Sequence, residues 1–115
     1  MAIPENRLTS EEIQKLFQRK ENHFLDFKDC RIAPAKLTET VSAFANADGG
    51  ELYVGVCEVD QALKWRGFPN IESANGHLQA FENLFPLGQF FRYEFLTSAD
   101  TMAVCFSSRS EKIPQ

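Results

Sequence analysis

The sequence lacks the patterns that would tie it to zinc, to disulfides or to a membrane. Its three cysteines, Cys30, Cys57 and Cys105, are far apart and form no CxxC or Cys/His cluster. We therefore expect reduced thiols and no structural metal site. The opening segment MAIPENRLTSEE has no apolar signal core, and no apolar run approaches the length that spans a bilayer. We expect a cytoplasmic protein without membrane contact.

An excess of positive charge is also missing. The formal net charge is −4 and the sequence pI is about 5.1. Because phosphate neutralisation supplies most of the non-specific affinity for nucleic acid, this balance excludes a histone-like coat. More than half of the Lys and Arg residues nevertheless fall within the first 36 positions, where acidic residues nearly balance them. The distribution leaves room for a local basic face.

The composition is that of one globular domain with its own core. The chain has 115 residues, of which 43% are hydrophobic and 24% are charged, and it shows no internal repeat and no low-complexity linker. We assign residues 1–115 to a single domain, with an ordered core at 8–106 and a polar tail at 107–115. The abrupt end of the chain suggests the N-terminal part of a longer protein.

The hydrophobic periodicity predicts elements in the order α-β-α-β-β-α-β-β. Thr9 and Glu12 form a capping box at the start of the first helix, and Asn70 is expected to begin the third. This order is typical of an α+β fold, with a mixed, mostly antiparallel sheet packed against about three helices. The expected ranges are helices at 9–20, 34–46 and 70–85, and strands at 21–28, 51–57, 63–68, 91–95 and 102–106.

Glycine marks two points of the expected backbone. Gly49 and Gly50 follow Asn46 and end the second helix, because glycine readily adopts the left-handed conformation of a helix exit. The pair could instead present backbone N–H groups to an anion. Asn46 is a candidate functional residue, although a helix terminator needs no ligand. Gly55, inside a predicted strand, is expected to leave room for a close neighbour.

Three segments of the sequence resemble one known family. They are ENHFLDFK at 21–28, SAFAN at 42–46 and GGELYVGV at 49–56, and together they resemble the Schlafen AlbA domain, also called the divergent-AAA or AlbA-type DNA-binding domain. The resemblance covers about residues 8 to 106 and implies an AlbA-like α+β fold. Members of this family include transcriptional regulators and helicase-related proteins of the RecG kind. It therefore implies a module that binds DNA or RNA, with a homodimer as one arrangement.

The same resemblance implies an alternative, a metal-dependent endoribonuclease. In Schlafen proteins the domain cleaves structured RNA with three acids, and the matching positions here are Glu21, Asp26 and Glu58, with Lys28 beside them. Three clustered carboxylates could hold Mg²⁺ or Mn²⁺ and activate water; no other cofactor is expected. A spacing of five along one strand places Glu21 and Asp26 on opposite faces unless a bend or bulge intervenes. All three could equally be solvated acids at strand ends.

Basic and aromatic residues supply the candidates for nucleic-acid contact. The candidates for phosphate contact are Lys28, Arg31 and Lys36, and Trp65 with Arg66 could stack on a base. The alternatives are an ordinary solvated face for the cations and a half-buried aromatic for Trp65. Three functions remain open: a nucleic-acid-binding module, a nuclease, and a protein interaction or dimerisation domain.

Overall fold

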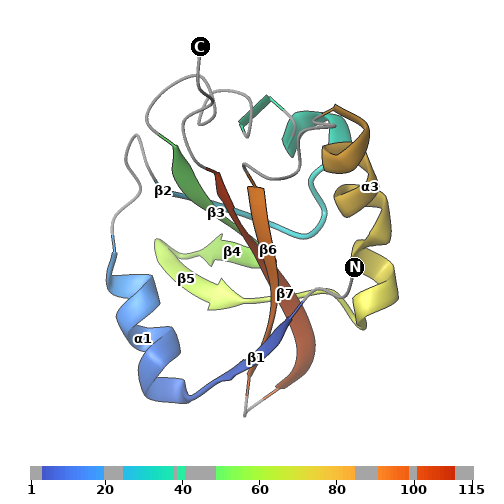
Figure 1. Ribbon diagram of the computed structural model, residues 1–115. Helices are drawn as coiled ribbons and strands as arrows, with labels where there is room; N and C mark the ends of the chain where they lie inside the picture. Colours follow the sequence, from blue (N-terminus) through green and yellow to red (C-terminus); the bar gives the residue numbers. More distant parts are fainter. Residues whose placement is uncertain are drawn as a thin grey trace.

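A five-stranded mixed sheet forms the centre of the protein, with strand order β1-β6-β7-β3-β2 (Figure 1). The computed structural model describes residues 4–19, 25–37, 39–40, 49–84, 91–98 and 101–110. Strand β7 runs antiparallel to its neighbours β3 and β6, whereas the edge strands β1 and β2 run parallel to β6 and β3. The strands are β1 (Glu5–Leu8), β2 (Leu25–Lys28), β3 (Gly50–Val54), β6 (Phe91–Ser98) and β7 (Thr101–Ser110).

A separate two-stranded hairpin, β4 (Val56–Val59) and β5 (Ala62–Trp65), follows β3. The sequence predicted one strand at 51–57, and this was wrong because the backbone of Gly55, at φ +114°, takes the chain out of the central sheet. The expectation of a close neighbour is confirmed. A Cβ on Gly55 would lie 2.6 Å from the Cys105 Sγ and 3.1 Å from the Gly67 Cα.

Helix α1 (Ser10–Gln18) begins as its sequence predicted. The Thr9 hydroxyl accepts from the Glu12 N–H and the Glu12 carboxylate accepts from the Thr9 N–H, each at 3.1 Å. The Asn70 side chain also caps as expected, but it caps the 3₁₀ turn η1 (Ile71–Ala74), which leads directly into α3 (Asn75–Leu84). Residues 34–37 and 39–40 are helical, and the rest of the predicted second helix, Asn46 included, lies outside the described residues.

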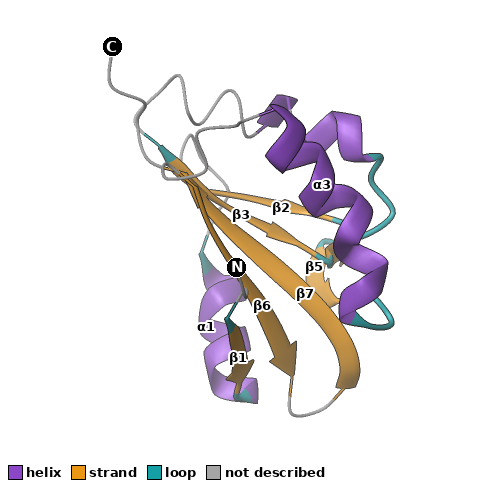
Figure 2. Cartoon of the chain, turned by 45° about the vertical axis from the view of Figure 1, so that its right-hand side comes forward, coloured by secondary structure: helices purple, strands orange, loops and turns teal. Residues whose placement is uncertain are grey.

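The helices cover opposite faces of the sheet, α1 on one side and α3 on the other (Figure 2). Side chains of alternating strand residues point to these two faces. The α3 face packs the buried residues Leu37, Leu52, Val54, Phe68, Ala74, Leu78, Phe95 and Val104. The α1 face packs Leu16, Leu25, Phe27, Val56, Leu96 and Cys105. The α+β class and the mixed sheet are thereby confirmed.

Other strands also differ from the expected ranges; β5, for example, ends at Trp65 and not at Phe68. Strand β1 was not predicted, because its four residues are mostly exposed and show no apolar alternation. Strand β7 continues beyond the predicted Phe106 to Ser110, so part of the expected polar tail is paired with β3. Ser108, in register with Leu52, is only 2% exposed. None of the helices in the described segments is long and apolar enough to cross a membrane.

Candidate nucleic-acid interface

Basic residues from separate segments meet beyond the end of β2. The Asp29 carboxylate accepts from Arg31 Nε at 3.3 Å and from Arg31 Nη2 at 3.0 Å, and its Oδ2 also lies 3.2 Å from Arg66 Nε. Gly55 holds the segments together, since its N–H donates to the Lys28 carbonyl and its carbonyl accepts from the Arg66 N–H. We call Lys28, Asp29, Arg31 and Arg66 the rim cluster.

Ion pairing fixes the arginines of the rim cluster without using up their donors. Burial raises the pKa of Asp29, but the hydrogen bonds from the Arg31 side chain and backbone outweigh it and hold the pKa below its ordinary value. A guanidinium carries five N–H donors, and Asp29 engages only Nε and Nη2 of Arg31 and Nε of Arg66. The Arg31 and Arg66 side chains remain 71% and 40% exposed. They are therefore positioned and accessible to a ligand.

The acids of the nuclease alternative lie near this cluster. Lys28 Nζ is 3.1 Å from Asp26 Oδ2. Glu58 is exposed on β4 and lines, with Lys28 and Asp29, a small hollow of about 170 Å³. Glu21 lies outside the described residues, and within those residues no three His, Cys, Asp or Glu side chains are placed to hold a metal ion. A three-acid site stays a prediction.

The other predicted residues have mixed positions. Lys36 is exposed in the helical stretch at 34–37. Trp65 is half-buried against the α1 face, and its indole N–H donates to the Ala103 carbonyl at 3.1 Å, which is the packing alternative considered above. Gly49 is buried with φ +93° and Gly50 begins β3, whereas the end of the helix that precedes them lies outside the described residues.

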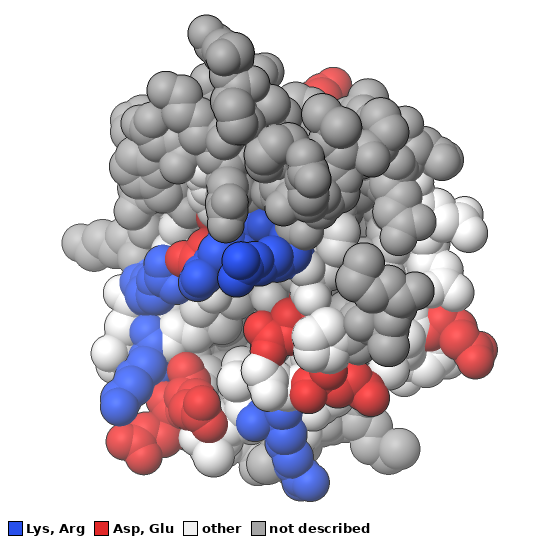
Figure 3. Space-filling model, in the orientation of Figure 1, with Lys and Arg blue, Asp and Glu red and all other residues white. Residues whose placement is uncertain are grey.

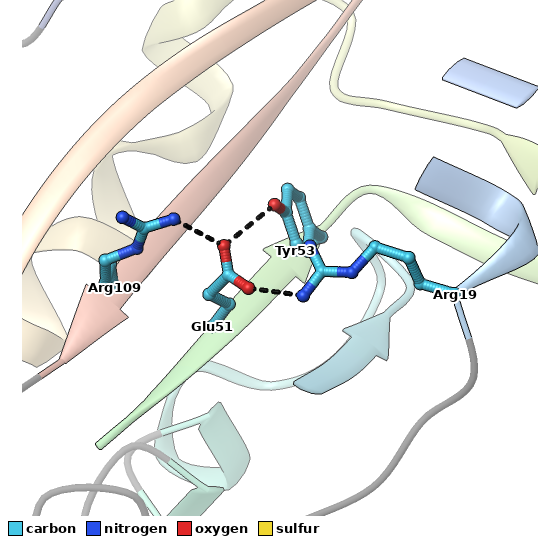
Figure 4. Close-up of polar contacts among 4 residues, drawn as sticks. All are labelled: Arg19, Glu51, Tyr53 and Arg109. Atoms are coloured by element: carbon cyan, nitrogen blue, oxygen red, sulfur yellow. Dashed lines mark hydrogen bonds and ion pairs between the residues drawn. The ribbon is translucent and has the colours of Figure 1, made fainter. Parts of the chain in front are cut away.

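A second arginine cluster, which the sequence did not indicate, centres on Glu51 of β3 (Figure 4). Glu51 Oε2 lies 2.6 Å from Arg19 Nη2, and Oε1 lies 2.8 Å from Arg109 Nη2. The Tyr53 hydroxyl donates to Oε1 at 3.3 Å. We call these four residues the Glu51 cluster. They come from the end of α1, from β3 and from β7, and only the strand register and the helix exit bring them together.

The arginines determine the charge state of this cluster. Burial raises the pKa of Glu51, but the hydrogen bonds from Arg19 and Arg109 outweigh it and lower the pKa below the ordinary value. The same carboxylate raises the pKa of both guanidinium groups, through its hydrogen bonds. Burial, followed by the charge of Glu51, raises the pKa of Tyr53. Glu51 is therefore an anion that fixes two cations in place.

A hollow of about 340 Å³ lies beside the Glu51 cluster. Two rows of residues in cross-strand register line it: Arg92, Arg109 and Glu51 form one row, and Glu94, Ser107 and Tyr53 form the next. In the space-filling view, Lys and Arg side chains form a band between α1 and β6, with acidic side chains enclosed in it (Figure 3). A sequence without known strand pairing gives no signal for this arrangement.

Comparison with known proteins identifies a family. The family model described as Schlafen, AlbA_2 matches residues 21–96, which is more than half of the chain. The matched range contains the whole rim cluster together with Glu51 and Tyr53, whereas Arg19 and Arg109 lie outside it. None of the curated proteins matches this sequence.

Proposed function

The chain belongs to the Schlafen AlbA_2 family, a family of nucleic-acid-related domains, and on this premise we propose that it is a DNA-binding module of a transcriptional regulator or RecG-helicase-related protein. The rim cluster supplies the phosphate contacts in this proposal, and Lys36, which is exposed in the helical stretch at 34–37, is a further candidate.

The observation that supports the proposal is the pairing of Arg31 and Arg66 on one carboxylate. Arg31 and Arg66, which are distant in the sequence, present two partly exposed guanidinium groups on the Asp29 carboxylate, and Lys28 directly precedes Asp29 in the chain. Guanidinium groups bind phosphate oxygens through parallel N–H donors, and a side chain that is already fixed loses less conformational entropy on binding. Asp29 therefore acts as the support of a phosphate-binding surface.

The charge balance of the rim defines what kind of binding to expect. Asp26, Asp29 and Glu58 lie close to the three cations, so the rim exerts little long-range attraction on a polyanion. Binding then depends on short-range hydrogen bonds to the backbone and carries no base preference of its own. Three phosphate contacts on duplex DNA correspond to a salt slope of about −2.7 in log K against log salt concentration.

The test is fluorescence anisotropy of labelled duplex DNA and labelled single-stranded RNA with the full chain at several salt concentrations. We expect Arg31→Gln and Arg66→Gln each to weaken binding by about fivefold and to reduce the salt slope by about one. Arg7→Gln is the matched control, because Arg7 is exposed on β1 and pairs in register with Thr97, away from the rim. Equal binding by all variants would contradict the proposal.

Asp29→Asn separates positioning from net charge. If the arginines bind phosphate as a pre-positioned pair, this variant weakens binding although it removes a negative charge. If general charge attraction is responsible, the same variant strengthens binding. We expect the weakening, because Asp29 is the shared partner of both guanidinium groups.

The two alternative functions can be tested on the same purified protein. A nuclease would cleave structured RNA with Mn²⁺, lose this activity in Glu58→Gln and stop in EDTA, whereas simple binding is unaffected by EDTA. Failure to bind either polymer at low salt would leave the interaction or dimerisation domain as the function. Size-exclusion chromatography with light scattering tests the homodimer, which is one of the arrangements that the resemblance implies.

A further inference from the structure

The hollow beside the Glu51 cluster is a second basic site, separate from the rim. Its cations are Arg92 of β6 and Arg109 of β7, with Arg19 at the end of α1 beside them. The rim lies beyond the C-terminal end of β2, whereas Arg92, Arg109 and Glu51 form a row across the strands near the start of β3. The two sites can therefore be altered independently.

Strand pairing forces two arginines together in this hollow. Arg92 and Arg109 are directly opposite each other in the β6–β7 pair, so their side chains project from the same face. Like charges in directly opposite positions destabilise a sheet. Glu51, which is opposite Arg109 on its other side, offsets part of this repulsion. A bound anion would offset more of it.

Glu51 also determines how the arginines are presented. Through one terminal nitrogen each, Arg19 and Arg109 bind different oxygens of the same carboxylate. Their side chains are nevertheless 45% and 64% exposed, so N–H donors beyond those two nitrogens are accessible. Arg92 and Arg109 line the hollow with two acids, Glu51 and Glu94, and Arg19, which is paired with Glu51, brings a third cation next to it.

We propose that this hollow binds a phosphate monoester, supplied either by the terminal phosphate of a nucleic-acid strand or by a free nucleotide. A monoester carries close to two negative charges at neutral pH, which matches a pair of guanidinium groups better than the single charge of a diester does. A hollow of about 340 Å³ is at the small end of the volume range of ligand pockets. The strand-end form of the proposal rests on the proposed function, whereas the free-nucleotide form does not.

The hollow supplies further donors for such a group. Ser107, in register between Glu94 and Tyr53, lines it and provides a hydroxyl on the same face. Glu94 lies one row from Arg92 and Arg109 along the strands and limits the site to ligands whose phosphate sits at the arginine row. Glu51 is a positioning residue in this arrangement: it holds Arg109 in place, and as a carboxylate it donates no hydrogen bond to the phosphate.

The test compares one labelled oligonucleotide with a 5′-phosphate, a 3′-phosphate or hydroxyl groups at both ends. We expect the full chain to bind one phosphorylated form roughly tenfold more tightly than the hydroxyl form, the effect of one to two charge-assisted hydrogen bonds. Arg92→Gln should abolish this preference and leave the affinity for the hydroxyl form unchanged. Arg7→Gln should retain it. Equal affinity of the intact chain for all three forms would overturn the strand-end form.

A second measurement distinguishes the free nucleotide. Titration of the full chain with AMP and adenosine by NMR should show saturable shifts for AMP alone, centred on Arg92, Arg109 and Ser107. Arg109→Lys keeps the positive charge but loses the planar guanidinium group with its paired N–H donors, so it should weaken AMP binding. Glu51→Gln should also weaken AMP binding, because it removes the carboxylate that holds Arg109 in place. If neither AMP nor a strand end discriminates by its phosphate, the inference is wrong. If oligonucleotides bind through the rim without such discrimination, the proposed function stands and only this site fails.

Discussion

Gly55→Ala should destabilise the protein strongly, because Gly55 is both conformationally special and tightly packed. A residue with a side chain at φ +114° would occupy a backbone region that costs about 1–3 kcal/mol. The new Cβ would lie 2.6 Å from the Cys105 Sγ and within 3.2 Å of two backbone atoms. Overpacking of this kind costs about 1–3 kcal/mol, and the lower entropy of the unfolded alanine chain returns about 0.4–1 kcal/mol. The net loss is about 1–6 kcal/mol, with a middle value of about 3 kcal/mol, a large part of the stability of a small domain.

Urea denaturation followed by far-UV circular dichroism measures this loss, with Gly76→Ala as the matched control. Gly76 lies in α3, and among the described residues nothing outside its chain neighbours and the backbone of its own helix is within 4 Å of the Cβ that alanine would add. Alanine there should raise the free energy of unfolding by about 0.5–1 kcal/mol. Adding Cys105→Ala to Gly55→Ala should recover part of the loss by removing the Sγ. A loss below about 1 kcal/mol for Gly55→Ala would refute the reasoning from φ and contact.

Two further predictions concern titrating groups. The pKa values of Glu51 and Asp29 are lowered in the folded state, so both carboxylates stabilise the fold above their unfolded pKa, and this stability is lost as the pH falls from about 5 to about 3. Urea midpoints across that range should fall less in Glu51→Gln than in the parent chain, and parallel curves would contradict the assignment. Cys105 is only 1% exposed, and its burial raises the pKa of the thiol. An alkylating reagent should therefore modify Cys105 later than the half-buried Cys30, which mass spectrometry can follow. Equal labelling rates in the native protein would show that the site opens readily.

Local patterns in the sequence predicted the elements whose stabilising contacts are also local. The Thr9–Glu12 capping box joins residues three positions apart, and the alternation of Leu25 and Phe27 reports directly which face of β2 is buried. The break at Gly55 could not be predicted in the same way, because its neighbours Cys105 and Gly67 reach it only in the folded chain. Glycine in a strand is compatible with a bulge, a sharp bend or a close backbone neighbour, and tertiary packing determines which of these forms.

In the candidate site, too, local sequence patterns predicted some residues, whereas contacts between distant segments could not be predicted. The sequence named Lys28, Arg31 and Arg66 as candidates for nucleic-acid contact, and the structure places both arginines on the carboxylate of Asp29. The Glu51 cluster gave no comparable signal, since Arg19 and Arg109 stand at opposite ends of the chain and meet through a helix exit and a strand register. Pairings between distant segments depend on the whole topology, and hydrophobic periodicity carries no information about them.

The two arginine clusters support the proposal that this acidic chain binds a polyanion. Asp29 and Glu51 each count as a negative charge in the total of −4, yet each holds two guanidinium groups whose outer donors are accessible. Net charge governs attraction over distances longer than the Debye length of about 8 Å at physiological salt, whereas a held guanidinium acts on contact. Neutralising Asp29 or Glu51 makes the chain more basic and should still weaken phosphate binding. On a general basic surface, a more positive net charge would strengthen phosphate binding. A loss of affinity despite the added positive charge would therefore show that the arginines bind because a carboxylate holds them in position.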